Sequence, residues 1–151
     1  MESFNKTWHT NKCYVYFAFD GDDFNLSEIT QILDIQPTKT TTKGQKRANK
    51  SQLKYSSTSW QLSTEKVVNE IIDVSEMASS LIQLLRPKTN LINNIRKKYQ
   101  VSTRLEVVLY ITYDQNQTTP ILNLNTENIN FLAQVGACFD VDIYRIGCVD
   151  Y

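Results

Sequence analysis

The chain has 151 residues, of which 41% are hydrophobic and 21% are charged, a composition typical of a globular protein rather than a disordered or fibrous one. Its 16 basic and 16 acidic side chains give a formal net charge of zero. Dedicated nucleic-acid binders usually carry a basic excess, because contacts with phosphates supply most of their affinity. The balance therefore argues against nucleic acid as the partner. We expect one domain over residues 1–151, with residues 1–11 as a loose N-terminal tail.

No apolar run reaches the roughly 18 to 20 residues that a membrane span needs, and the N-terminus lacks the apolar segment of a secretory signal. The three cysteines, Cys13, Cys138 and Cys148, are an odd number without a CxxC spacing. They favour free thiols in a reducing compartment over a disulfide or metal role. We therefore expect a cytoplasmic protein without membrane contact.

Alternating apolar residues predict a strand over residues 13–19, and the Gly and Asp content of residues 20–23 predicts a turn after it. Asn25 with Glu28 three positions later is typical of a capping box. A helix should therefore begin at this cap and stop before Pro37.

The next stretch predicts a hairpin. Residues 38–43 are rich in threonine and indicate a short strand, and residues 44–53 are polar without periodicity and indicate a loop. Residues 55–63 indicate the second strand, in which Trp60 and Leu62 share the core face.

Apolar residues at steps of three and four, Val67 and Val68 among them, predict a helix over residues 64–86. Pro87 interrupts it, because proline cannot continue the hydrogen-bond ladder without a kink. The pattern resumes over residues 88–100, where basic residues suit the negative end of the helix dipole.

Residues 103–113 predict a central strand, because both of its faces carry apolar residues. Residues 121–125 indicate a short strand, and Thr126 is expected to cap a helix that Gly136 closes. Residues 138–146 predict a last strand, whose inward side chains are expected to be Phe139, Val141 and Ile143.

This order of elements is β-α-β-β-α-β followed by β-α-β. It predicts an α+β fold with a ferredoxin-like core and an added β-α-β unit. The sheet should be mainly antiparallel and covered by helices on one face.

Few residues suggest chemistry. Asp20, Asp22 and Asp23 can supply oxygen ligands to a hard cation, but a polar turn before a helix explains them without a metal. Asp140 and Asp142 share a strand face, where paired carboxylates serve as acid–base catalysts when buried but more often point to water.

The single histidine, His9, leaves no Ser-His-Asp set and no two-His metal site, and no glycine-rich phosphate loop occurs. We accordingly predict no catalytic residues, no metal and no cofactor.

Between Pro37 and Trp60 lie six basic residues and no acidic one. This stretch can bind a phosphorylated small molecule or RNA, but it offers only Tyr55 and Trp60 for stacking. The alternative is a solvated hairpin loop.

Tyrosines recur on the expected strands. Several that share an exposed sheet face would form a natural surface for a protein or ligand, whereas the alternative is that helices cover them. They are Tyr14, Tyr16, Tyr110, Tyr113 and Tyr144.

Five short motifs resemble, in order and spacing, a bacterial family described only as a domain of unknown function, numbered four-two-seven-nine. The resemblance extends from about Tyr14 to Tyr144, and the family name supplies no activity. Small bacterial proteins of this kind are often immunity partners of secreted toxins, so the resemblance implies binding rather than catalysis. The motifs are Asp22-Asp23, Pro37-Thr38, Lys43-Gly44, Ser59-Trp60 and Asp142-Ile143-Tyr144.

We therefore expect a non-enzymatic protein-binding module, an immunity protein that occludes a cognate toxin or another bacterial protein. The alternatives are an anion or RNA binder that uses the basic hairpin over residues 39–54, and an enzyme that uses Asp140 or Asp142. The oligomeric state stays open. The candidate binding residues are Lys39, Lys43, Lys46, Arg47, Tyr55, Trp60, Asp22, Asp23 and Tyr144.

Overall fold

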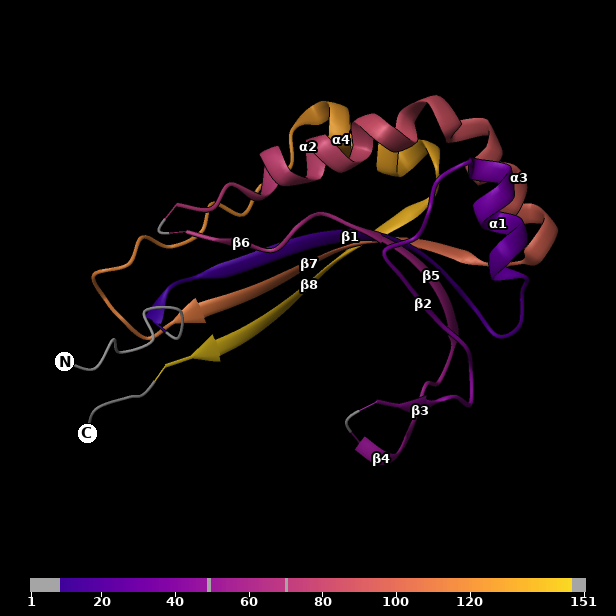
Figure 1. Ribbon diagram of the computed structural model, residues 1–151. Helices are drawn as coiled ribbons and strands as arrows, with labels where there is room; N and C mark the ends of the chain where they lie inside the picture. The colour runs from indigo at the N-terminus through magenta and orange to yellow at the C-terminus, as the bar shows by residue number, and fades with distance from the viewer. Residues whose placement is uncertain (1–8, 49, 70, 148–151) are drawn as a thin grey trace.

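The computed structural model describes residues 9–48, 50–69 and 71–147, which form a mixed α+β fold (Figure 1). A layer of helices lies over one face of a curved sheet, and a small hairpin lies on the side of the sheet away from the helices. The elements are β1 (Lys12–Gly21), α1 (Leu26–Leu33), β2 (Lys39–Thr41), β3 (Lys46–Arg47), β4 (Lys50–Lys54), β5 (Thr58–Ser63), β6 (Val67–Val68), α2 (Val74–Leu85), a 3-10 turn (Arg86–Lys88), α3 (Thr89–Tyr99), β7 (Ser102–Thr112), α4 (Thr126–Gln134) and β8 (Ala137–Ile146).

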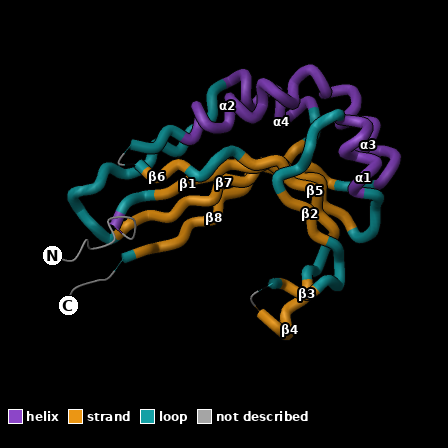
Figure 2. Tube along the Cα trace, viewed as in Figure 1, coloured by secondary structure: helices purple, strands orange, loops and turns teal. Residues whose placement is uncertain are grey.

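The main sheet has the strand order β2-β5-β1-β7-β8, and β6 pairs with the start of β1 (Figure 2). Strand β1 is antiparallel to both β5 and β7, and β2 is antiparallel to β5. Only the β7–β8 pair among the described strands is parallel. The expected α+β class with a mainly antiparallel sheet is therefore confirmed.

The hydrophobic core fills the space between the sheet and the helices. Period-two alternation directs one face of β1 and β7 into it. Trp60 on β5 is fully buried, as expected, and packs edge-on against Phe19. Its indole Nε1 donates a hydrogen bond to Thr30 Oγ1 at 3.0 Å, which joins β5 to α1. The core residues on β1 and β7 are Cys13, Val15, Phe17, Phe19, Leu105, Val107 and Leu109.

The expected start of the first helix is confirmed. Asn25 Oδ1 accepts a hydrogen bond from the Glu28 backbone N–H at 3.1 Å, which satisfies one of the free donors of the first turn. The helix ends at Leu33, where Asp34 adopts a left-handed conformation.

The helix expected over residues 64–86 is wrong in its first part. Val67 and Val68 form β6, which pairs with Lys12 and Cys13 of β1. Helix α2 begins only at Val74, where the Asp73 side chain accepts a hydrogen bond from Glu76 N–H at 3.2 Å. The pairing of β1 with β5 begins only at Tyr16, so the first residues of β1 offer a backbone partner on that side, which a helical period cannot reveal. The β-branched valines also suit an extended chain.

The break at Pro87 is confirmed, because the proline lies in the 3-10 turn that separates α2 from α3. The expected basic last turn of α3 is also present. Gly136 follows α4 with a φ of 59°, and the Arg96 guanidinium lies so close that a Cβ at this position would clash with it.

Three further expectations need correction. The loop expected over residues 44–53 contains the hairpin β3–β4. The strand expected over residues 121–125 is a single bridge between Ile121 and Asp73. Of the three side chains expected to face inward on β8, only Val141 is half-buried, since Phe139 is 43% and Ile143 55% exposed at the edge of the sheet.

The loose tail expected over residues 1–11 is wrong at Asn11, while residues 1–8 lie outside the described part. Asn11 is buried, its Nδ2 donates to the Thr118 carbonyl at 2.8 Å, and its Oδ1 accepts from Thr112 N–H at 2.9 Å.

Candidate functional site

One face of the main sheet carries no helix in the described part of the chain, and we call it the open face (Figure 1). The strand registers place mainly polar and aromatic side chains on it, opposite the core-facing positions. From β5 across to β8 these residues are Ser59, Gln61, Ser63, Tyr14, Tyr16, Ala18, Asp20, Arg104, Glu106, Val108, Tyr110, Cys138, Asp140, Asp142 and Tyr144.

Glu106 on β7 is the buried charge of the open face, with only 3% of its surface exposed. Its Oε2 accepts a hydrogen bond from the Tyr16 hydroxyl at 2.8 Å and also contacts Arg104 Nη1. Arg104 Nε in turn donates to Asp20 Oδ2 at 3.2 Å. The buried carboxylate is therefore both hydrogen-bonded and paired, as burial of a charge requires.

Burial raises the pKa of Glu106 above its ordinary value, and the Asp142 carboxylate raises it further. The hydrogen bond from Tyr16 and the charge of Arg104 oppose this rise. The pKa of Tyr16 is also raised, first by burial and then by its hydrogen bond to Glu106. Both groups thus favour their neutral forms more than they would in water.

Two pairs of stacked tyrosines surround this cluster. The rings of Tyr14 and Tyr16 have centroids 6.2 Å apart, and those of Tyr110 and Tyr144 are 5.2 Å apart. Lys66 Nζ connects the pairs, since it lies 5.6 Å from the Tyr14 centroid and 5.3 Å from that of Tyr110. The alternative that helices cover the tyrosines is wrong for these four, because the helices pack on the opposite face.

The basic stretch forms a second cluster around Tyr55. Arg47 Cζ lies 5.2 Å and Lys39 Nζ 5.9 Å from the centroid of this ring. Lys43 is directed to the turn after β1 instead, because its Nζ forms an ion pair with Asp22 Oδ1 at 2.8 Å. Lys46 is exposed on β3.

The remaining candidate residues are dispersed. Trp60 lies in the core and offers no contact surface, and Asp23 is exposed in the turn after β1. Tyr144 lies on β8, at the opposite edge of the sheet from β2. The structure therefore brings Lys39 and Arg47 together at Tyr55, places Tyr144 on the open face and leaves the other predicted binding residues apart from both.

The acidic turn after β1 is the part of the chain that was expected to offer oxygen ligands to a cation. Asp20 pairs with Arg104 and Asp22 pairs with Lys43, so two of the three turn carboxylates have basic partners. Among the described residues, no three His, Cys, Asp or Glu side chains are grouped so that they could hold a metal ion.

Asp140 and Asp142 are both exposed, as the simpler interpretation expected. Glu106, which the sequence pattern did not single out, is instead the carboxylate with the burial that acid–base catalysis requires. The alternation of residues 103–113 carried the signal, because it places Arg104 and Glu106 opposite the core residues Leu105 and Val107.

The chain matches the family described as "Domain of unknown function (DUF4279)" over residues 11–145. It belongs to this family. The expected resemblance is thus confirmed, and the match includes both the open face and the basic hairpin of this DUF4279 chain. No curated protein and no solved structure matches it.

The open face of the DUF4279 chain is suited to recognition. Its charged centre is already paired, and the hydrogen bond to Glu106 holds the Tyr16 ring in place. Within the described residues, no helix is both long and apolar enough to cross a membrane.

Proposed function

We propose that this DUF4279 chain is a non-enzymatic protein-binding module that uses the open face as its interface. The observation that carries the proposal is the double tyrosine stack on a sheet face without a helix layer. Tyrosine and arginine are enriched in protein interfaces, because they bury large areas and keep a polar group for hydrogen bonding.

The ordered centre of the face supports this role. Tyr16, Arg104 and Glu106 hold one another, so these side chains lose little further conformational freedom when a partner binds. The tyrosines can then act as binding hot spots around a fixed centre.

The partner in this proposal is a toxin that the chain neutralises by occlusion, as an immunity protein in the bacterial cytoplasm. The described cysteines, Cys13 and Cys138, are free thiols, which supports a reducing compartment. The toxin as partner rests on the general association of small single-domain bacterial proteins with secreted toxins.

The test uses any toxin-like domain that the neighbouring genes encode. Co-expression should protect cells, and the double variant Tyr110→Ala/Tyr144→Ala should weaken binding at least about tenfold, the effect of losing about 1.4 kcal/mol at hot spots. Tyr113→Ala is the matched control, because Tyr113 is exposed but stacks on Arg145 outside the tyrosine pairs. Failure to protect would contradict toxin neutralisation. Unchanged affinity in a folded double variant would exclude the open face.

A second candidate function is binding of a phosphorylated small molecule or RNA at the Tyr55 cluster. Lys39 and Arg47 support it, because they gather over one aromatic ring that can stack on a base. The triple variant Lys39→Gln/Lys46→Gln/Arg47→Gln should abolish salt-sensitive binding of a short single-stranded RNA, and unchanged binding would exclude this site.

The core also fits the expected ferredoxin-like arrangement, which we include in the proposal. Strands β1, β2, β5 and β7, with α1 and the pair α2–α3 between them, follow the β-α-β-β-α-β order. Their spatial order β2-β5-β1-β7 supports this assignment.

A further inference from the structure

Strand β8 is one of the two edges of the main sheet. It comes last in the strand order and pairs only with β7 among the described strands. The Val141 N–H donates a hydrogen bond to the side chain of its neighbour Asp140, at 2.9 Å. The Ile146 carbonyl accepts from the Tyr113 N–H and so points toward β7, and by the alternation of strand backbone groups Val141 points away from β7. The edge therefore offers a backbone ladder to another strand.

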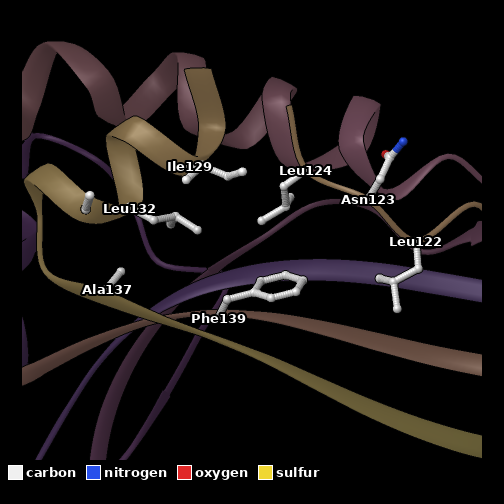
Figure 3. Close-up of a pocket in the computed structure, with 8 residues that line it drawn as sticks. Leu122, Asn123, Leu124, Ile129, Leu132, Ala137 and Phe139 are labelled. Atoms are coloured by element: carbon white, nitrogen blue, oxygen red, sulfur yellow. The ribbon is translucent and has the colours of Figure 1, made fainter. Parts of the chain in front are cut away.

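An apolar groove runs beside this edge on the helix side of the sheet, between α4, the segment before α4 and β8 (Figure 3). Its volume is about 480 Å³. Phe139 projects from β8 toward it and is 43% exposed, and Ile129 of α4 is 51% exposed. The apolar lining is completed by Leu122, Leu124, Leu132, Ala133 and Ala137.

The other side of the same edge is acidic. Asp140 and Asp142 belong to the open face and are exposed, while the alternate positions Phe139 and Val141 face the groove side. A strand that pairs with β8 therefore meets apolar surface with every second side chain and carboxylates with the others.

We propose that β8 is the docking edge for an extended segment of a partner protein in which apolar residues alternate with lysine or arginine. Its backbone pairs with β8, its apolar side chains enter the groove, and its basic side chains face Asp140 and Asp142. The Asp140 carboxylate then exchanges the Val141 N–H for a cation of the partner. This inference rests on the proposed protein-binding function and names the chemistry of the segment that binds.

A second copy of the chain fits this edge less well than a basic segment. Two β8 strands can pair antiparallel with both open faces on the same side of the sheet. The largest number of residues then pairs when the two-fold axis passes between the two copies of Val141 or of Asp142. The first register places Asp140 opposite Asp142 twice, and the second places Asp142 opposite its own copy. Like charges directly opposite each other destabilise a strand pair, so the charge pattern favours a basic partner.

The probe is a fluorescein-labelled heptapeptide that alternates lysine and valine, compared with a scrambled peptide of the same composition. By fluorescence anisotropy the alternating peptide should bind at least about tenfold more tightly, since only it can present both side-chain sets to β8. Val141→Pro should reduce its affinity to that of the scrambled peptide, because proline removes the outward N–H while the β7 side of the strand keeps its bonds. Val141→Thr keeps the N–H and is the matched control.

A second measurement uses the unaltered chain, so its result does not depend on whether the proline variant folds. Hydrogen exchange at the Val141 amide should slow at least about fivefold with the alternating peptide and not with the scrambled one, because pairing protects the amide. Equal binding of the two peptides, or unchanged exchange at Val141, would overturn the proposal. So would a dimer in sedimentation that Val141→Pro converts to monomer, since the occupant would then be a second copy.

The outcomes separate this inference from the proposed function. If the peptide fails while Tyr110→Ala/Tyr144→Ala still loses the protein partner, strand docking is wrong and the open face keeps its role. If the peptide binds as expected and the tyrosine variant keeps full affinity for the partner, the open face loses its role and the docking edge stands.

Discussion

The Tyr16 hydroxyl donates a hydrogen bond to Glu106 Oε2 across the β1–β7 pair, at 2.8 Å, and the two residues are direct partners in the strand register. The contact joins the aromatic part of the open face to its one buried carboxylate. Arg104 approaches the same oxygen, so the carboxylate depends on two donors. The properties of the open face should therefore respond to changes in either the charge or the donors of this cluster.

The pH dependence of stability should reveal Glu106. A carboxyl group whose pKa is raised in the folded state binds its proton more tightly there than in the unfolded chain. Its contribution to the free energy of unfolding is fully present below the ordinary pKa of 4.5 and is lost as the pH rises through the folded-state pKa. Each pKa unit of the rise corresponds to about 1.4 kcal/mol. Glu106→Gln should therefore flatten the decline in unfolding free energy between pH 4.5 and neutral pH.

Urea denaturation at several pH values checks this expectation. Glu65→Gln is the control, because Glu65 is an exposed glutamate outside the cluster, and it should keep the decline of the unaltered chain. A decline that is equally steep in Glu106→Gln would contradict the raised pKa of Glu106.

The hydrogen bond between Trp60 and Thr30 should contribute to stability. Thr30→Val removes the acceptor of a fully buried indole N–H, which should lower the free energy of unfolding by about 1–3 kcal/mol. Thr30→Ser keeps the hydroxyl oxygen and should recover most of that loss. Urea denaturation followed by tryptophan fluorescence measures both variants, and equal stability of the valine and serine variants would rule out the hydrogen bond as the cause.

The Asn25 cap should stabilise α1. Asn25→Ala removes the acceptor for the Glu28 N–H and should lower the free energy of unfolding by about 1 kcal/mol. Asn25→Asp preserves a carboxylate acceptor at the helix N-terminus and should stay close to the unaltered chain. Thermal unfolding followed by circular dichroism distinguishes the two, and an alanine variant as stable as the aspartate variant would contradict the capping role.

The thiols of Cys13 and Cys138 should differ sharply in reactivity. Burial raises the pKa of the Cys13 thiol to about 12, so at neutral pH it is both inaccessible and protonated, whereas Cys138 is exposed. In a Cys148→Ser background, which removes the cysteine outside the described residues, iodoacetamide should label Cys138 in the folded chain. Cys13 should react only after denaturation. Mass spectrometry of tryptic peptides reads both sites, and rapid labelling of Cys13 in the folded state would show that the start of β1 opens readily.

Features that depend on neighbouring residues could be predicted from the sequence. The Asn25 cap and the break at Pro87 are local, and the alternation in β1, β7 and β8 identified these strands directly. Trp60 was placed in the core because its alternation with Leu62 requires no knowledge of distant residues.

Features that depend on distant partners could not be predicted in the same way. Val67 and Val68 satisfy a helical period, but their pairing with Lys12 and Cys13 decides their conformation. The edge position of β8 likewise leaves Phe139 and Ile143 exposed, although their alternation is that of an inward face. In both cases a backbone or packing partner far along the chain outweighs the local pattern.

The same distinction between local and distant partners applies to the candidate site. The sequence by itself determined which residues alternate along each strand. It therefore also determined that tyrosines and acidic residues lie on strand faces opposite the apolar residues. Only the tertiary structure decided that the helices all cover the other face, and that Tyr16 meets Glu106 from a position 90 residues away in the chain. The reason is physical: alternation is a property of one strand, whereas the burial and pKa of Glu106 depend on which strands lie beside it and on what covers them.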